Sequence, residues 1–546
     1  MRQPRSLIEP IKSSLHAWRA ASLTPLERPQ FRTIWTASLV SNIGAAIQTV
    51  GAAWTMTTLV ESPQLVALVQ TAAMLPIVLL ALPSGALADT IDRRKLMLVS
   101  QVLGFAAAAA LAVIAYAGVM SPISLLACTA MVGAAVALYQ PAWQASLADF
   151  VPRTELPAAV ALNALAFNTA RSVGPAIGGA VIAVFGPAMT FVLNAASFTG
   201  LIAVLTRTRL PAATSSLPPE RVSQAIAGGL RYVGMSPPLQ RTYIRGALFG
   251  FGASALWSLM PLVAQSRLGG GPISYGLLMG SFGFGSLSAA LLAAHLRALL
   301  GNDRLVAMAT AAFAASTAVA GLSPFAGLTV PFMLIAGASW IFIFTTTRTC
   351  TQLCSPRWVV GRTISLAQVA GFGCMAIGAA FWGGLAAQIG LVAALLAAAV
   401  YLAATLIAVR LAPLPAANVD DYSPHGGPIG QPPQTAIDGR LGPIVVTIQY
   451  SVPADKQAEF TALMQELGQM RRRNGAARWS LRQDIDDPST WFEQIESASW
   501  VDHVRRIERN TVADAQLNER AAAYRASAPN AIRRMAVRPP GSEPLR

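Results

Sequence analysis

The sequence predicts an all-α membrane protein of twelve spanning helices in two six-helix bundles, followed by a small cytoplasmic α+β domain with a ferredoxin-like fold. Of the 546 residues, 54% are hydrophobic and only 12% are charged, whereas soluble proteins carry about 25% charged residues. The mean hydropathy of +0.51 is too high for a chain of this length that faces water throughout. Of the 65 charged residues, 32 lie in the last 134 residues of the chain. A soluble enzyme of this length, a disordered chain and a disulfide scaffold are therefore excluded.

Twelve apolar stretches are each long enough to cross a membrane, which takes about 20 helical residues at a rise of about 1.5 Å per residue. They lie near residues 31–58, 64–88, 95–118, 122–147, 157–185 and 188–208, and then near 243–265, 272–297, 303–322, 325–349, 357–386 and 390–411. Helices are predicted because lipid cannot satisfy exposed backbone groups and the stretches are too long for the strands of a barrel.

Basic residues are distributed unevenly between the connections. Those after the odd-numbered spans contain one basic residue, Arg267, whereas those after the even-numbered spans contain many, including Arg93 and Arg94. Because basic loops stay on the cytoplasmic side, both termini are expected in the cytoplasm, with the chain in a bacterial inner membrane. Residues 1–412 hold 24 basic and 9 acidic residues, and residues 413–546 hold 16 of each. The net charge of +15 therefore belongs to the membrane part, and nucleic acid is not an expected partner.

Composition divides the chain into six segments. We expect a cytoplasmic N-terminal segment at 1–30, a first bundle at 31–208 and a proline-rich connection with an amphipathic helix at 209–242. A second bundle at 243–412, a linker at 413–442 and a tail domain at 443–546 follow. The two bundles resemble each other weakly, since Pro152-Arg153 leads into the fifth span and Pro356-Arg357 into the eleventh. Two six-helix repeats around a central site form a transporter architecture.

The loop after the second span carries a glycine, an acid four residues later and a basic pair: Gly85, Asp89, Arg93 and Arg94. This pattern resembles the signature between the second and third helices of the major facilitator superfamily. The resemblance implies a twelve-helix major facilitator fold, in which the glycine lets two helices approach. It also implies that Asp89 faces the positive end of the eleventh helix and acts as a latch between two rocking states. An ordinary charged turn is the alternative, and Thr90 and Asp92 depart from the usual residues of the signature.

The fifth span contains a second motif, small residues around a proline: Gly174, Pro175, Gly178 and Gly179. Glycines four residues apart permit close packing of helices, and proline removes a backbone hydrogen bond and favours a bend. The motif resembles the Gly-Pro-x-x-Gly-Gly element of proton-driven exporters, which implies a pivot or a seal; simple packing is the alternative. Together with residues 139–171 it resembles the enterobactin-exporter-like branch of the superfamily. That likeness implies export of siderophores, drugs or other amphipathic metabolites.

Arg171 lies in the middle of the fifth span, where a charge costs at least about 2.5 kcal/mol and needs a partner or a cavity. Asn163 and Phe167 lie eight and four residues before it, on the same helix face. We expect this face to line a substrate cavity in which Arg171 holds an anionic group. Polar residues of two other spans are expected to complete the lining: Asn42, Gln48 and Gln368. The alternative is an arginine satisfied by backbone carbonyls and by Asn42 or Asn194.

No acidic residue falls in the middle of a span, although nine are present in residues 1–412. Protons are therefore expected as the coupling ion only through the resemblance to proton-driven exporters. Cys350 and Cys354 lie one helical turn apart without a histidine or a second cysteine pair. No metal site is predicted from them, and no cofactor is expected.

The tail follows a β-α-β-β-α-β pattern, with elements expected at 444–450, 454–473, 477–484, 491–496, 499–524 and 534–538. This order is typical of a ferredoxin-like fold, and the tail resembles the small dimeric α+β barrels related to antibiotic-synthesis monooxygenases. Trp479, Trp491 and His503 are not accompanied by a nucleophile or a metal-binding set. An inactive regulatory or dimerising module is therefore expected, with self-association through this domain.

Together these features predict a secondary active transporter. We expect an exporter of amphipathic small molecules, siderophore-like metabolites or drugs, that works in the lipid bilayer by alternating access and is coupled to protons. It is not expected to be an enzyme. Three alternatives stay open: an importer of similar molecules, a membrane-tethered monooxygenase-like enzyme, and a scaffold that does not transport.

Overall fold

A computed structural model describes residues 24–152, 155–208, 222–415, 422, 437–527 and 531–538. The expected N-terminal segment and the linker at 413–442 lie largely outside these described residues. The chain forms two compact units. One holds most of the long helices, and the other combines the tail domain with residues 223–240 and 349–364.

The first six long helices begin and end close to the predicted spans. They are α2 (Pro29–Leu59), α3 (Pro63–Thr90), α4 (Arg93–Tyr116), α5 (Pro122–Phe150), α6 (Leu156–Phe185) and α7 (Ala188–Arg207), after a short turn η1 (Thr24–Glu27). Proline occupies the first helical turn of α2, α3 and α5, where its missing N–H is tolerated. Ser62 and Ser121 cap α3 and α5, and Asp92 caps α4 by accepting from the amides of the first turn. Local sequence signals therefore fix where these helices begin.

The second group of long helices follows the short helix α8 (Val222–Gly234). It consists of α9 (Pro237–Leu262) with the turn η2 (Val263–Arg267), α10 (Pro272–Leu322), α11 (Ala326–Leu353), α12 (Val360–Ile389), and α13 (Leu391–Ala404), which continues through η3 (Thr405–Ile407) into α14 (Ala408–Leu411). The predicted spans 272–297 and 303–322 both fall in α10. The helix is interrupted only at Gly301, whose φ of 76° is a conformation that favours glycine.

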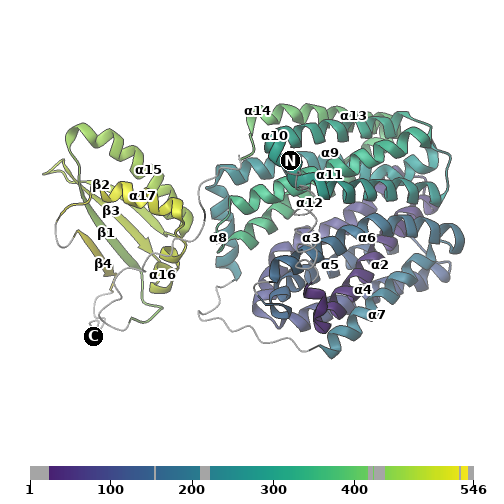
Figure 1. The fold of residues 1–546 in the computed structure, drawn as a ribbon, viewed down its shortest axis with the longest axis horizontal. Coiled ribbons are helices and arrows are strands. Elements are labelled where there is room, and N and C mark those ends of the chain that lie inside the picture. Colours follow the sequence, from purple (N-terminus) through teal and green to yellow (C-terminus); the bar gives the residue numbers. More distant parts are fainter. Residues whose placement is uncertain are drawn as a thin grey trace, which may run out of the picture. The chain divides into compact units, whose positions relative to one another are not determined.

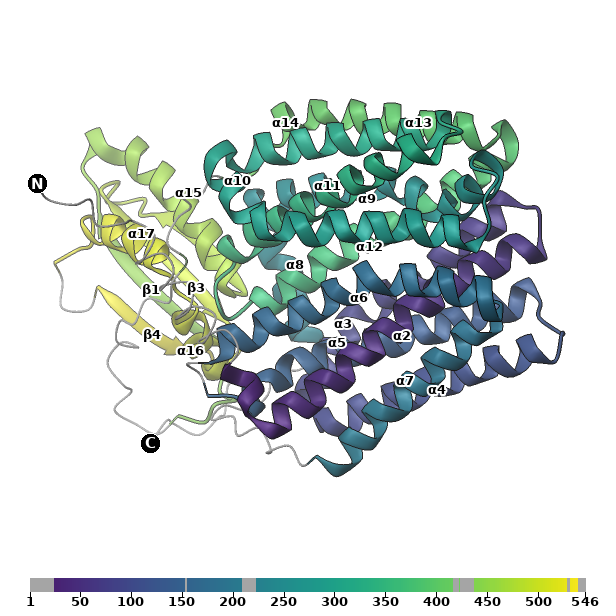
Figure 2. The same ribbon diagram turned by 45° about the vertical axis from the view of Figure 1, so that its right-hand side comes forward.

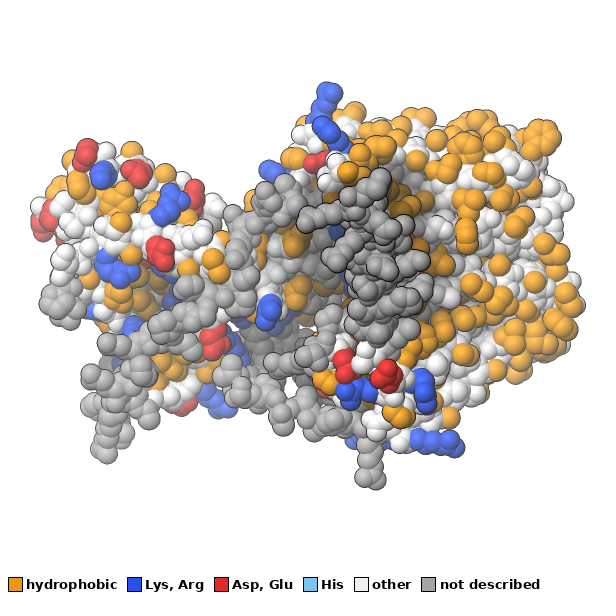
Figure 3. Space-filling view, viewed as in Figure 1, with side chains coloured by type: hydrophobic (Ala, Val, Ile, Leu, Met, Phe, Trp, Pro, Cys, Tyr) orange, Lys and Arg blue, Asp and Glu red, His pale blue; other side chains and the backbone are white. Residues whose placement is uncertain are grey.

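Among the described residues, nine helices are long and apolar enough to cross a membrane. The long helices lie side by side in two groups, α2–α7 and α9–α14 (Figures 1 and 2). Within the first group α3 packs on α5, and α2 packs on α6 and α7; between the groups α6 packs on α10. Apolar side chains cover the flank of the helical unit on the face seen in Figure 3, and the visible charged side chains of this unit lie toward one end. This distribution fits a surface that faces lipid.

The tail forms a four-stranded antiparallel sheet with the strand order β2-β3-β1-β4. Its elements are β1 (Ile444–Ser451), η4 (Ala454–Lys456), α15 (Gln457–Asn474), β2 (Arg478–Gln483), β3 (Thr490–Ser497), α16 (Trp500–Glu508), α17 (Val512–Ala522) and β4 (Ile532–Ala536). The single helical stretch expected at 499–524 is two helices, because Thr511 and Asp514 form a capping box that starts α17. One face of the sheet packs on the helices through an apolar core around Phe460 and Tyr450.

Candidate functional site

Arg171 is surrounded by aromatic rings from both groups of helices. On its own helix, α6, the guanidinium carbon lies 5.6 Å from the ring centre of Phe167. From the second group, Trp257 of α9 and Trp340 of α11 approach it at 5.2 and 5.8 Å. A guanidinium at these distances from ring centres is attracted by the negative faces of the rings. We refer to Phe167, Trp257 and Trp340 as the aromatic box.

The aromatic box continues into a larger aromatic cluster of the second group. Trp257 lies 4.8 Å from Phe282, and Trp340 stacks on Phe344 at 5.4 Å. The indole nitrogen of Trp257 is buried and finds no hydrogen-bond partner in the described part of the chain. Within the same part, no carboxylate forms an ion pair with Arg171. The guanidinium therefore retains its donors for a ligand, among side chains whose rings are apolar and planar.

Two of the other predicted cavity residues, Asn163 and Gln48, are hydrogen bonded to protein groups. Asn163 accepts a hydrogen bond of 2.7 Å from the indole of Trp143. Gln48 is buried and accepts from the amide of Asn194, so Asn194 is engaged away from Arg171. Gln368 on α12 is partly buried. The structure thus brings Phe167 and Arg171 together and adds two tryptophans that the sequence analysis did not single out.

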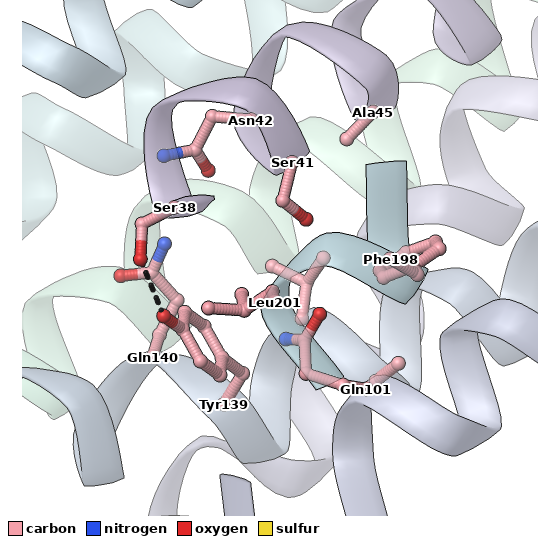
Figure 4. A pocket seen from close by; sticks show the side chains of 11 residues that line it. Ser38, Ser41, Asn42, Ala45, Gln101, Tyr139, Gln140, Phe198 and Leu201 are labelled. Atoms are coloured by element: carbon pink, nitrogen blue, oxygen red, sulfur yellow. Dashed lines mark hydrogen bonds between the residues drawn. The ribbon is translucent and has the colours of Figure 1, made fainter. Parts of the chain in front are cut away.

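Asn42 lines a separate small cavity between α2, α4, α5 and α7, together with Ser38, Gln101 and Tyr139 (Figure 4). The hydroxyls of Ser38 and Tyr139 lie 2.9 Å apart and are hydrogen bonded. The cavity has a volume of about 30 Å³, which is room for about two water molecules. It is too small for an amphipathic substrate.

The glycines of the fifth predicted span face two different helices. A Cβ at Gly174 would lie 2.5 Å from the Cβ of Ala46, and one at Gly178 would lie 3.2 Å from Val50, both on α2. A Cβ at Gly179 would lie 2.6 Å from the Cα of Gly276 on α10, so here the two backbones touch. Pro175 lies inside α6, between Gly174 and Gly178 in the sequence. These small residues allow α6 to pack closely on both neighbours.

The residues of the loop motif are engaged within the first group of helices where the structure describes them. Arg93 forms an ion pair of 3.0 Å with Asp149, and Arg94 donates to the carbonyl oxygens of Leu205 and Thr206 at the end of α7. Gly85 lies in α3, and no described atom is within 4 Å of the place that a Cβ would take there. Asp89 is in the last turn of α3, but its side chain lies outside the described residues. The role of Asp89 as a latch therefore stays a prediction.

A family model described as "Transmembrane secretion effector" matches residues 20–539. The chain belongs to this family of major facilitator superfamily transporters. Members of the family and the relatives below are transporters and not enzymes, which confirms that expectation.

This family member resembles curated transporters over part of its length. The staphyloferrin A transporter of Staphylococcus aureus is 30% identical over 172 residues, which cover 31% of this chain and 43% of that protein. The multidrug efflux pump Tap of Mycolicibacterium fortuitum is 27% identical over 227 residues, which cover 40% and 55% of the two chains. The chain spans about half the length of the curated relatives it matches.

Solved structures of other transporters share the fold of this family member. A bacterial homologue of the human lysosomal transporter Spinster aligns with a TM-score of 0.53 at 16% identity, over 70% of this chain and 94% of that chain. The nucleoside transporter NupG aligns with a TM-score of 0.53 at 15% identity, over 70% and 98%. These likenesses show the fold alone, that of a multi-pass major facilitator transporter.

The tail domain of this family member buries a polar network around Glu493. The carboxylate accepts from the hydroxyl of Tyr450 at 2.8 Å, from Arg471 at 3.0 Å and from the indole of Trp479 at 3.0 Å. Burial opposes ionisation of Glu493, but Arg471 outweighs it, and the pKa of the carboxyl is lowered. Both carboxylate oxygens accept from protein donors, and the bond from Arg471 ties the sheet to α15. In the described residues, no group of three His, Cys, Asp or Glu side chains is arranged to hold a metal.

The stability of the tail domain is expected to fall as the pH drops from about 6.5 to about 4. Burial, with Arg506 and Arg534 nearby, lowers the pKa of His503 from 6.5 to about 4. Between these values the unfolded state binds the extra proton, which lowers its free energy relative to that of the folded domain. The loss is on the order of 2 kcal/mol. Hydrogen exchange of the β1 amides in the full-length protein measures it. The dependence should flatten in His503→Gln, and an unchanged slope in that variant would assign the effect to other groups.

Proposed function

We propose that the protein is an exporter of anionic amphipathic small molecules, siderophore-like metabolites or drugs, which works by alternating access between its two groups of helices. The observation that carries this proposal is the position of Arg171 in the aromatic box, at the junction of α6 with α9 and α11. A binding site between two bundles is one that can open to either side of the membrane in turn. The names of the relatives that export drugs or transport a siderophore support the same substrate class.

The chemistry of the box suits an anion attached to a planar or apolar body. A guanidinium offers two parallel donors to a carboxylate or a similar group. Trp257 and Trp340 offer flat apolar faces, and the free indole N–H of Trp257 adds a further donor. When an anion binds, Arg171 exchanges its weak attraction to the rings for a charge-assisted hydrogen bond, and the rings become available to the body of the substrate.

We also propose twelve crossings with both termini in the cytoplasm of a bacterial cell, in the inner membrane. Gly301 divides the 51 residues of α10 into two helices, each long enough to cross a membrane, so α10 counts twice. Adding α2 and α6 to the nine candidates then gives twelve. The uneven distribution of basic residues supports the orientation. The strand order β2-β3-β1-β4 supports a ferredoxin-like tail domain, and its self-association stays a prediction.

Transport by purified protein in vesicles tests the proposed function. We expect anionic amphipathic dyes to move from the cytoplasmic side outward, faster than neutral dyes of similar size, with protons moving in the opposite direction. Movement only inward would favour the importer. No movement of any dye, with the protein folded, would favour the scaffold.

A further inference from the structure

The second compact unit contains more than the tail domain. It also includes α8 with its link to α9, residues 223–240, and the connection between α11 and α12, residues 349–364. These three pieces are far apart in sequence, so the unit is held together by contacts between the tail domain and two connections of the membrane part. Two of those contacts each pair an arginine of the domain with an aromatic residue of a connection.

The first contact is made by Tyr232 of α8. Its side chain is fully buried, and the guanidinium of Arg473, at the end of α15, lies 5.6 Å from its ring centre. The Tyr232 hydroxyl donates to the carbonyl oxygen of Cys354 at 3.2 Å, and its ring meets that of Trp358 edge to face at 5.7 Å. Tyr232 therefore joins α8, the 349–364 connection and the tail domain at one point.

The second contact is made by Trp358 of the same connection. The guanidinium carbon of Arg509 lies 4.1 Å from the ring centre of Trp358, which is direct stacking. Arg509 also donates to the carbonyl oxygen of Asn474 at 3.1 Å. This hydrogen bond ties the arginine that follows α16 to the end of α15, beside Arg473.

Both arginines are positioned by the domain itself. Arg473 forms an ion pair with the buried carboxylate of Asp514, which also accepts from the side-chain amide of Asn474 at 2.9 Å. Asp514 is fixed in turn by the capping box with Thr511. Because side chains held in this way lose little freedom on docking, the contacts with Tyr232 and Trp358 form at low entropic cost.

The two connections lead directly into helices that build the candidate site. Residues 235–240 lead from α8 into α9, which carries Trp257, and residues 349–353 are the last turn of α11, which carries Trp340. Residues 360–364 are the first turn of α12. A domain fixed to both connections therefore holds together the ends of three helices of the second group.

We propose that the tail domain is a docked brake, which slows the transport cycle by holding the ends of α9, α11 and α12 through the pairs Arg473–Tyr232 and Arg509–Trp358. A ligand or protein that binds the tail domain and releases it from the two connections would then increase the rate of transport. The proposal rests on the proposed function for its transport readout, but docking is measured independently of any substrate.

The test compares full-length Arg473→Ala/Arg509→Ala with a matched control, Arg472→Ala/Arg520→Ala. The control removes the same charge from the domain, but Arg472 stacks on Trp479 within the domain and Arg520 faces Glu466 at the surface. Hydrogen exchange of residues 223–240 and 349–358 reports docking, and the initial rate of dye export from vesicles reports transport. Exchange of the β1 amides reports whether the domain is still folded.

We expect exchange in both connections to rise at least fivefold in the test variant, and export to rise at least threefold, with neither changed in the control. Tyr232→Leu/Trp358→Leu removes the aromatic rings of the connections and leaves the domain unchanged, and it should give the same two changes. This variant replaces the first one if Arg473→Ala/Arg509→Ala unfolds the domain. Unchanged exchange would overturn the docking. Faster exchange with unchanged or slower export would overturn the brake. Absence of export from the wild type would contradict the proposed function and leave the docking result to stand alone.

Discussion

Arg171→Ala is expected to abolish substrate-dependent transport, by at least a hundredfold in initial rate, while the protein still folds in the membrane. The arginine supplies the only positive charge that we place in the candidate site, and the rings of Phe167, Trp257 and Trp340 cannot replace its hydrogen bonds to an anion. A charge-assisted hydrogen bond contributes about 1.5–3 kcal/mol, so two bonds to one anionic group account for this loss. Initial rates of dye efflux from vesicles measure it.

Lysine at position 171 should restore only part of the activity. It keeps the charge, but it lacks the planar fork that pairs with an anion and stacks on tryptophan. Arg32→Ala is the control, because Arg32 is exposed near the beginning of α2. If Arg171→Ala kept more than a tenth of the wild-type rate, the arginine would be a packing residue and the substrate site would lie elsewhere.

Gly179→Val is expected to reduce transport at least tenfold by preventing the close packing of α6 on α10. A Cβ at this position would lie 2.6 Å from the Cα of Gly276 and 2.8 Å from the carbonyl oxygen of Pro272. Both are backbone atoms, which cannot rotate away, so the helices must separate. Overpacking of this kind costs about 1–3 kcal/mol. This cost destabilises the conformation described here, in which α6 and α10 touch, but not a conformation in which the two helices are apart. The equilibrium between the two conformations therefore shifts toward the second.

Thermal stability in detergent and transport rate, measured together, separate this effect from misfolding. Gly276→Val should behave in the same way, because it faces Gly179 across the contact. Gly200→Val on α7 is the control, since no described atom lies within 4 Å of its added carbon. Normal transport by Gly179→Val would show that the α6–α10 contact need not form during the cycle.

The positions of the helices could be predicted from the sequence because each depends on signals within one segment. Length of the apolar run, proline in the first turn and a serine or aspartate cap fix where α3, α4 and α5 begin. Within α10 the chain turns at Gly301, a single glycine with positive φ, and the two expected spans 272–297 and 303–322 lie on either side of this kink. The capping box at Thr511 is a local signal too, and it divides the expected helix 499–524.

The candidate site could be predicted only in part, because its partners come from distant segments. Phe167 and Arg171 share a face of α6, which helical periodicity reveals. Trp257 and Trp340 approach from α9 and α11, and nothing in the periodicity of those segments distinguishes them from packing residues. Gln48 shows the converse: it was expected to line the substrate cavity, and the structure pairs it with Asn194 in a buried hydrogen bond. Whether a polar residue of a span faces a cavity or bonds to another helix depends on how the helices pack, which the sequence of one segment does not contain.

The aromatic surroundings of Arg171 have an electrical consequence for the proposed cycle. An arginine side chain stays protonated in proteins, and within the described residues no acid pairs with this one. The empty binding site then carries one positive charge, and a bound monoanion cancels it. Membrane voltage, worth about 2.3 kcal/mol per elementary charge at 100 mV, therefore acts on the return step, in which the site holds no anion, and leaves the anion-loaded step almost untouched.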